Sequence, residues 1–184
     1  LLLSYTMAGT ILLISNVTSS VIQPVFGYWS DRQKKIFLLP LGSLFAGIGL
    51  STLPLPDHYG LVVLLVTISG LGVAAYHPEG LKTARFFTGD KMATGLSIFT
   101  VGGNLGFALG PVVALFIITH LGLNYLLLIL AFSLAFIFLL FSIWGSLSET
   151  VPTMSGKGSS TKKIPKGAYV SVGLIVATVT MRSW

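Results

Sequence analysis

The sequence predicts an all-α protein that crosses a membrane several times, and three observations lead to this fold class. Hydrophobic residues make up 53% of the chain, and the mean hydropathy is +0.89. Charged residues make up only 9%, whereas a soluble chain carries about 25%. The charges also gather in short segments between long apolar stretches. Because a charged side chain at the centre of a bilayer costs about 2.5 kcal/mol or more, these segments must lie in water while the apolar stretches span the membrane.

Six apolar stretches are candidates for membrane helices, which need about 20 mostly apolar residues. They cover residues 5–29, 36–53, 60–87, 92–119 and 123–145, and the sixth begins near Gly167 and runs to the end of the chain. Residues 146–166 between the last two are rich in Ser, Gly, Thr and Lys, which predicts a flexible linker.

The ends of these stretches carry helix start and stop signals. Ser4 is placed as an N-cap before the first stretch, and the turn with Pro54 and Pro56 ends the second. The residues His77-Pro78-Glu79-Gly80 interrupt the third, and a kink is expected because Pro78 lacks an N–H and clashes with the preceding turn.

The Lys and Arg residues predict the orientation of the chain. Ten of the 11 lie in alternate connections, at residues 30–36, 82–91 and 146–166. The opposite turns, residues 54–60 and 119–124, contain none. By the positive-inside rule, the three basic connections are cytoplasmic.

Composition excludes several other classes of protein. The chain has no Cys, so it has no disulfide framework, thiolate metal site or thiol nucleophile. The net charge of +6 is spread over short loops and not gathered on one surface, so nucleic acid is not the expected partner. His58, His77 and His120 fall in different layers and cannot share a metal ion. No enzyme motif remains, and we expect neither catalysis nor a cofactor.

A charged segment follows the first apolar stretch, with the sequence Gly27-Tyr-Trp-Ser-Asp31-Arg32-Gln-Lys-Lys35. Gly27 lets two helix ends approach, and Asp31 can accept hydrogen bonds at a nearby helix N-terminus. The segment resembles the loop between the second and third helices of the major facilitator superfamily, although Lys34 and Trp29 replace its usual Gly and Leu. The resemblance implies a cytoplasmic gate formed by Gly27, Asp31, Arg32 and Lys35. The alternative is a basic loop that only sets topology.

Glycines recur every four residues in the fourth stretch. The set is Gly102, Gly106 and Gly110, with Gly103 beside them and Pro111 following. Such spacing makes a flat stripe on which another helix can pack closely, and Pro111 weakens the helix locally. The stripe resembles the antiporter motif in the fifth helix of the same superfamily, which is associated with exporters. Ser97, Ala114 and Leu115 replace glycines of that motif, and ordinary helix packing is the alternative.

His77 and Glu79 are ionisable residues near the end of a membrane helix. His77 lies about 17 residues after Gly60, or roughly 25 Å at about 1.5 Å per residue, and so near the cytoplasmic side. Ionisable groups at this depth usually face a cavity or one another. They are therefore candidates for a proton relay or a substrate contact. The alternative is a salt-bridged helix end in which Glu79 pairs with Lys82.

Arg182 is the remaining charge, about 15 residues or roughly 22 Å into the last stretch. An arginine at that depth should face a cavity, where it suits a phosphonate or carboxylate. If the helix starts later or ends earlier, Arg182 instead marks its outer end.

Three segments together narrow the resemblance: Gln23-Pro24 with Gly27-Tyr-Trp, Tyr76-His77-Pro78-Glu79, and Val101-Gly102-Gly103-Asn104-Leu105-Gly106. They resemble the fosmidomycin-resistance branch of the superfamily, which comprises bacterial exporters. The resemblance implies a twelve-helix fold, of which this chain is an internal fragment with about six helices. Residues 1–146 then form the first half without its first helix, residues 147–166 the central linker, and residues 167–184 the start of helix seven.

The function implied is secondary active transport across a bacterial inner membrane by alternating access. We expect a proton-coupled exporter of small anionic or drug-like molecules, with protons, the substrate and the lipid bilayer as its partners. The alternatives are an uptake symporter or uniporter of the same fold, or a membrane sensor that transports nothing.

Overall fold

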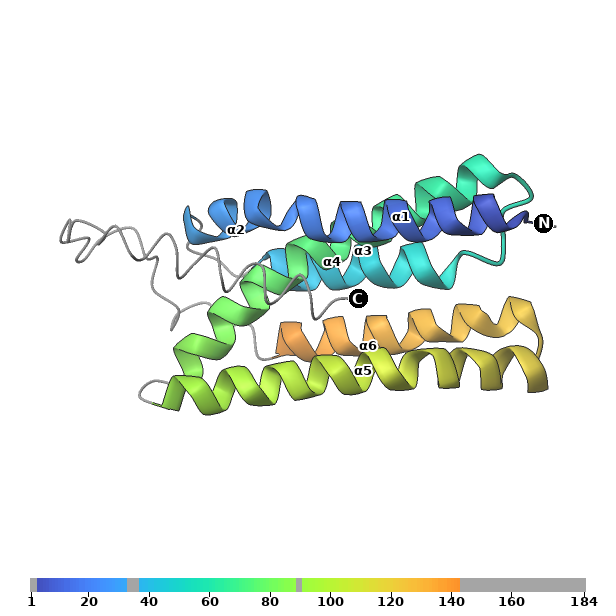
Figure 1. The fold of residues 1–184 in the computed structure, drawn as a ribbon. Helices are drawn as coiled ribbons and strands as arrows, with labels where there is room; N and C mark the ends of the chain where they lie inside the picture. The colour runs from blue at the N-terminus through green and yellow to red at the C-terminus, as the bar shows by residue number, and fades with distance from the viewer. Residues whose placement is uncertain (1–2, 33–36, 89–90, 143–184) are drawn as a thin grey trace. The chain divides into compact units, whose positions relative to one another are not determined.

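The computed structural model describes residues 3–32, 37–88 and 91–142, and these residues form helices and no strands (Figure 1). The order is α1 (Tyr5–Val21), α2 (Gln23–Arg32), α3 (Leu38–Ser51), α4 (Tyr59–Thr88), α5 (Met92–His120), the 3-10 helix η2 (Leu123–Leu127) and α6 (Leu128–Ser142). The all-α prediction is therefore confirmed. The linker and the sixth apolar stretch lie outside the described residues.

The first apolar stretch forms one candidate membrane span, Tyr5–Arg32, as predicted, but a break divides it into α1 and α2. Ser4 caps α1 as predicted, since its side chain accepts a hydrogen bond from the Met7 N–H at 3.2 Å. The break falls at Ile22, two residues before Pro24. Pro24 has no N–H to give to the preceding turn, so the regular hydrogen bonding of α1 cannot continue through it.

The predicted interruption of the third stretch was wrong. α4 runs without a break for 30 residues and contains Pro78. A proline removes one hydrogen bond from a helix, but in an apolar environment the remaining backbone groups still need their partners inside the helix. The helical backbone is therefore kept on both sides of Pro78.

The remaining helices agree with the predicted stretches to within a few residues, apart from the start of the fifth. That stretch opens with η2, which follows Gly122. Gly122 has a φ of 107°, a conformation that side chains other than glycine rarely adopt. This turn lets α6 run back in the direction opposite to α5 (Figure 1).

α4 is the central element, because it contacts α1, α2, α3 and α5. Its closest neighbour is α3, where Gly42 and Gly72 face each other. A Cβ atom built on Gly42 would lie 2.6 Å from the Gly72 carbonyl oxygen. The two helices thus pack backbone to backbone, as small residues allow in membrane proteins. α6 in turn packs on α3, where Gly47 meets the Ser133 side chain.

Among the described residues, four helical segments are long and apolar enough to cross a membrane: Tyr5–Arg32, Tyr59–Arg85, Met92–His120 and Leu123–Ser142. Large apolar side chains on them are exposed, among them Phe107, Phe132 and Phe138. Apolar surface of this extent is unfavourable in water and favourable against lipid or further helices. These observations indicate a membrane protein with several spans.

Candidate functional site

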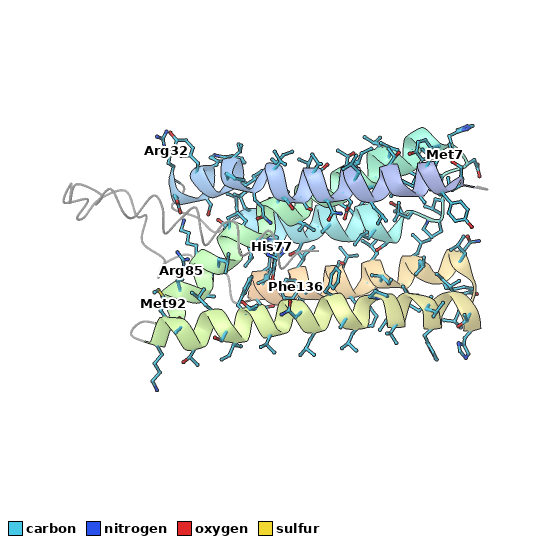
Figure 2. All side chains as sticks on the ribbon, viewed as in Figure 1. Met7, Arg32, His77, Arg85, Met92 and Phe136 are labelled. Atoms are coloured by element: carbon cyan, nitrogen blue, oxygen red, sulfur yellow. The ribbon has the colours of Figure 1, made fainter. Side chains whose placement is uncertain are left out.

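A cavity of about 390 Å³ lies between α3, α4 and α6. Its polar lining comes from Ser43 on α3, Tyr76 and His77 on α4, and Ser133 on α6. Apolar lining includes Phe132 and Phe136 of α6, and Figure 2 shows His77 and Phe136 directed into the same space. Volumes of 300–1,000 Å³ with a few polar groups among apolar ones are typical of small-molecule sites.

His77 lies at this cavity within a cluster of aromatic rings. Its ring meets those of Tyr76 and Phe99 edge to face, with centroids 5.9 and 6.4 Å away. Within the described part of the chain, neither ring nitrogen of His77 takes part in a hydrogen bond. The ring nitrogens are therefore available to a proton or a ligand.

Glu79 lies on a different face of α4 and does not line the cavity. Residues two positions apart in an α-helix are separated by about 200° around the helix axis. His77 and Glu79 are therefore directed to different neighbours. The Glu79 side chain is fully buried, and its Oε1 accepts a hydrogen bond from the Ser30 hydroxyl of α2 at 3.4 Å. The backbone N–H groups of Leu39 and Leu38 lie near the carboxylate but make no hydrogen bond of normal geometry to it. The structure thus places His77 and Glu79 in different environments, although the sequence predicted that they form one site.

Lys82 does not form the ion pair with Glu79 that the alternative interpretation of this segment required. Its Nζ donates a hydrogen bond to the Ser30 carbonyl at 2.6 Å. The ammonium still lies near enough to Glu79 to attract its charge. Ser30 was not identified from the sequence, although it is a small polar residue inside a charged segment.

The gate residues that the structure describes lie at the end of α2. Gly27 packs on Pro78 of α4, with 3.6 Å between a Cβ built on Gly27 and the proline Cβ. The Arg32 guanidinium stacks on Tyr28, 4.0 Å from the ring centroid. Asp31 is exposed, and among residues 3–32, 37–88 and 91–142 it has no hydrogen-bond or ion-pair partner. Lys35 lies outside the described residues.

The glycine stripe lies on an open face of α5. No other described residue comes within 4 Å of a Cβ built on Gly102, Gly103, Gly106 or Gly110. Pro111 is exposed and lies inside the continuous helix. The described part of the chain therefore contains no helix packed on the stripe, and Arg182 lies outside the described residues.

The structure adds side chains that sequence reasoning missed, chiefly Ser133, Phe136 and Phe99. Ser133 interrupts a run of large apolar residues, and a polar residue inside such a run is a signal that could have been used. The two phenylalanines gave no signal, because phenylalanine is common in every membrane helix. Among the described residues, no group of three or more His, Cys, Asp or Glu could hold a metal ion.

Comparisons with known proteins place these features in a family. The sequence pattern of the Major Facilitator Superfamily matches residues 1–181. The "Fosmidomycin resistance protein" of Escherichia coli (strain K12) is 35% identical over 170 residues, which cover 91% of this chain and 42% of that protein. The "Uncharacterized MFS-type transporter YfnC" of Bacillus subtilis (strain 168) is 30% identical over 179 residues, which cover 96% of this chain and 43% of that protein.

A shorter match reaches an animal protein, the "Sphingosine-1-phosphate transporter SPNS2" of Danio rerio, at 30% identity over 57% of this chain and 22% of that protein. No solved structure matches the chain significantly. The chain spans less than half the length of the two bacterial relatives. With the family pattern matched over nearly all of its residues and with apolar helices suited to a membrane, the chain belongs to the Major Facilitator Superfamily.

Proposed function

We propose that this chain is part of a proton-coupled exporter of small anionic or drug-like molecules, located in a bacterial inner membrane and working by alternating access. The observation that carries the proposal is the position of His77, whose ring lines a cavity among membrane helices and makes no hydrogen bond to any described residue. Histidine is the side chain whose charge changes most readily near neutral pH. A histidine beside a space for a small molecule suits a transporter that exchanges protons for substrate.

The exporter direction is supported by the open glycine stripe and by similarity to a fosmidomycin resistance protein. In this proposal Gly102, Gly103, Gly106, Gly110 and Pro111 form the surface on which the other half of the transporter moves. Gly27, Asp31, Arg32 and Lys35 form the cytoplasmic gate. The protein is proposed to be a transporter and not an enzyme.

Arg182 is proposed to bind the anionic group of the substrate. A charge-assisted hydrogen bond contributes about 1.5–3 kcal/mol, so Arg182→Gln should raise the apparent KM by about tenfold or more. An unchanged KM in vesicle transport would remove the argument for an anionic substrate.

Transport in inverted membrane vesicles tests the proposed function, with fosmidomycin as the probe. The full-length transporter is expressed, and the vesicle lumen is acidified. The lumen of an inverted vesicle corresponds to the cell exterior, so an exporter accumulates fosmidomycin there and loses it when an uncoupler is added. If fosmidomycin instead left the lumen together with protons, the protein would be a symporter. No fosmidomycin movement in either direction, combined with intact insertion, would contradict the proposed substrate class.

A further inference from the structure

Two charged side chains of α4 reach the ends of two other helices. Glu79 and Lys82 are three residues apart, so they project from the same side of α4. Lys82 contacts the last turn of α2, and Glu79 contacts both that turn and the first turn of α3. These ends belong to consecutive helices of the chain, so α4 bridges the point where one helix stops and the next begins.

Lys82 satisfies a carbonyl that α2 cannot satisfy itself. Ser30 lies two residues before the end of α2 at Arg32, and the last four carbonyl groups of a helix have no partner within the helix. The Lys82 ammonium donates to the Ser30 carbonyl at 2.6 Å. A cation at this position also complements the negative end of the helix dipole. Lys82 therefore caps α2 from a neighbouring helix.

Glu79 lies near the first turn of α3, whereas Lys82 lies at the last turn of α2. The residue before α3 is Phe37, whose side chain makes no capping hydrogen bond. Phenylalanine has no acceptor, so the first N–H groups of α3 need one from elsewhere. The Glu79 carboxylate lies near the N–H groups of Leu39 and Leu38, although neither N–H makes a hydrogen bond of normal geometry to it. A carboxylate also complements the positive end of the helix dipole.

The burial of Glu79 strengthens this interpretation. Its side chain is 0% exposed, and Oε2 has no hydrogen bond of normal geometry among the described residues. A buried carboxylate is unfavourable unless its surroundings compensate its charge. The first turn of α3, the Ser30 hydroxyl and the nearby Lys82 ammonium provide that compensation.

We propose that Glu79 and Lys82 form a helix-end clasp, defined by these two side chains, Ser30, and the N–H groups of Leu38 and Leu39. The clasp joins the end of α2, the start of α3 and the middle of α4 into one mechanical unit. Glu79 and Lys82 are positioning residues, since they act through the helix ends that they hold. The further statement that this unit moves as a whole during transport rests on the proposed function.

Thiol accessibility in the purified full-length transporter tests the clasp without relying on transport. Leu38 is 0% exposed in the first turn of α3, and this chain has no cysteine of its own. A Leu38→Cys variant should react slowly with a water-soluble maleimide. Adding Lys82→Met or Glu79→Ala should raise the rate by about fivefold or more, because the helix ends separate more often.

Matched variants separate the clasp from general loosening of the fold. Lys82→Arg keeps a cationic donor and should stay close to the parent rate, as should Lys91→Met at the exposed start of α5 and Asp57→Ala in an exposed turn. Glu79→Gln keeps an acceptor without the charge and should give an intermediate rate. If Glu79→Ala does not fold, the Lys82→Met and Lys82→Arg pair decides alone.

The outcomes distinguish the clasp from its role in transport. Equal labelling rates in Lys82→Met and Lys82→Arg would overturn the clasp, even if transport fell in both. Faster labelling in Lys82→Met supports the clasp whatever the transport result. If Lys82→Met also lowers the maximal rate of transport without changing the KM, the proposal that this unit moves as a whole during transport is supported. If the maximal rate of transport is unchanged, that role is rejected, but the clasp itself is still supported.

Discussion

His77 and Glu79 lie two positions apart on α4, yet they belong to different environments. His77 faces the cavity between α3, α4 and α6, whereas Glu79 is buried against Ser30 and the start of α3. The helical repeat of 3.6 residues separates them. Substitutions at the two positions should therefore have different consequences, although both residues are ionisable and lie in the same short segment of the sequence.

His77→Gln should damage transport driven by the proton gradient. Glutamine is close in size and polar, but it cannot gain a proton near neutral pH. We expect proton-driven efflux to fall by about tenfold or more, while exchange of substrate without a gradient is retained. His58→Gln, at an exposed residue before α4, is the matched control and should behave as wild type. Equal loss of both activities in His77→Gln would assign His77 to substrate binding and not to protons.

Asp31→Asn should stop transport without preventing membrane insertion. Asp31 is exposed at the end of α2, so losing its charge should change the stability of the described fold by less than about 1 kcal/mol. Transport in vesicles and the amount of inserted protein are both measured, with Asp57→Asn as the control. Wild-type transport by Asp31→Asn would contradict the proposed gate.

Glycine has two different roles at the level of the helices. On α3 and α4, Gly42 and Gly72 let two backbones meet, and a Cβ on Gly42 would lie 2.8 Å from the Tyr76 backbone nitrogen. On α5, Gly106 and Gly110 face open space among the described residues. The same residue type thus closes one interface and leaves another surface free.

Gly42→Ala should destabilise the packing of α3 on α4. The obstructing atoms are backbone atoms, which can move away only if the helices separate. We expect a loss of about 2 kcal/mol in the free energy of unfolding, measured as a lower Tm of the purified protein in detergent. Gly9→Ala on α1 is the control, since nothing lies within 4 Å of a Cβ there. Equal Tm values for the two variants would show that α3 and α4 are not in backbone contact.

Gly106→Leu should impair transport if the open stripe receives another helix during the cycle. A leucine would hold two backbones apart, whereas Gly106→Ala adds only one methyl group. We expect the leucine variant to lose about tenfold or more of its transport rate and the alanine variant less than about twofold. Equal rates for both variants would mean that this face of α5 meets lipid.

At the largest scale, the helices of the described residues combine a small packed region with a large apolar surface. The buried apolar residues come mainly from α3 and α4, while Phe107 of α5 and Phe138 of α6 are 85% and 75% exposed. This distribution fits a chain whose remaining surface is covered by lipid or by the rest of a longer transporter. The two bacterial relatives are each more than twice the matched length.

Cysteine labelling tests the orientation of the whole chain. Because the sequence contains no Cys, each single variant reports one position. A Ser159→Cys variant should react with a membrane-impermeant reagent only from the cytoplasmic side, and a His58→Cys variant only from outside. If each variant reacted only from the other side of the membrane, the orientation inferred from the Lys and Arg residues would be wrong.

The sequence by itself was sufficient for the class of protein, the approximate helix positions and the family. Hydropathy and charge act locally, so long apolar stretches and the charged segment after Gly27 are visible without any tertiary information. Only the tertiary structure showed that Glu79 faces α3, that Lys82 caps α2 and that Gly42 meets Gly72. Spacing along one helix indicates which residues share a face, but it does not indicate which helix lies opposite. Which helix lies opposite depends on the packing of all the helices together. This packing decided which of the predicted residues lie close to one another.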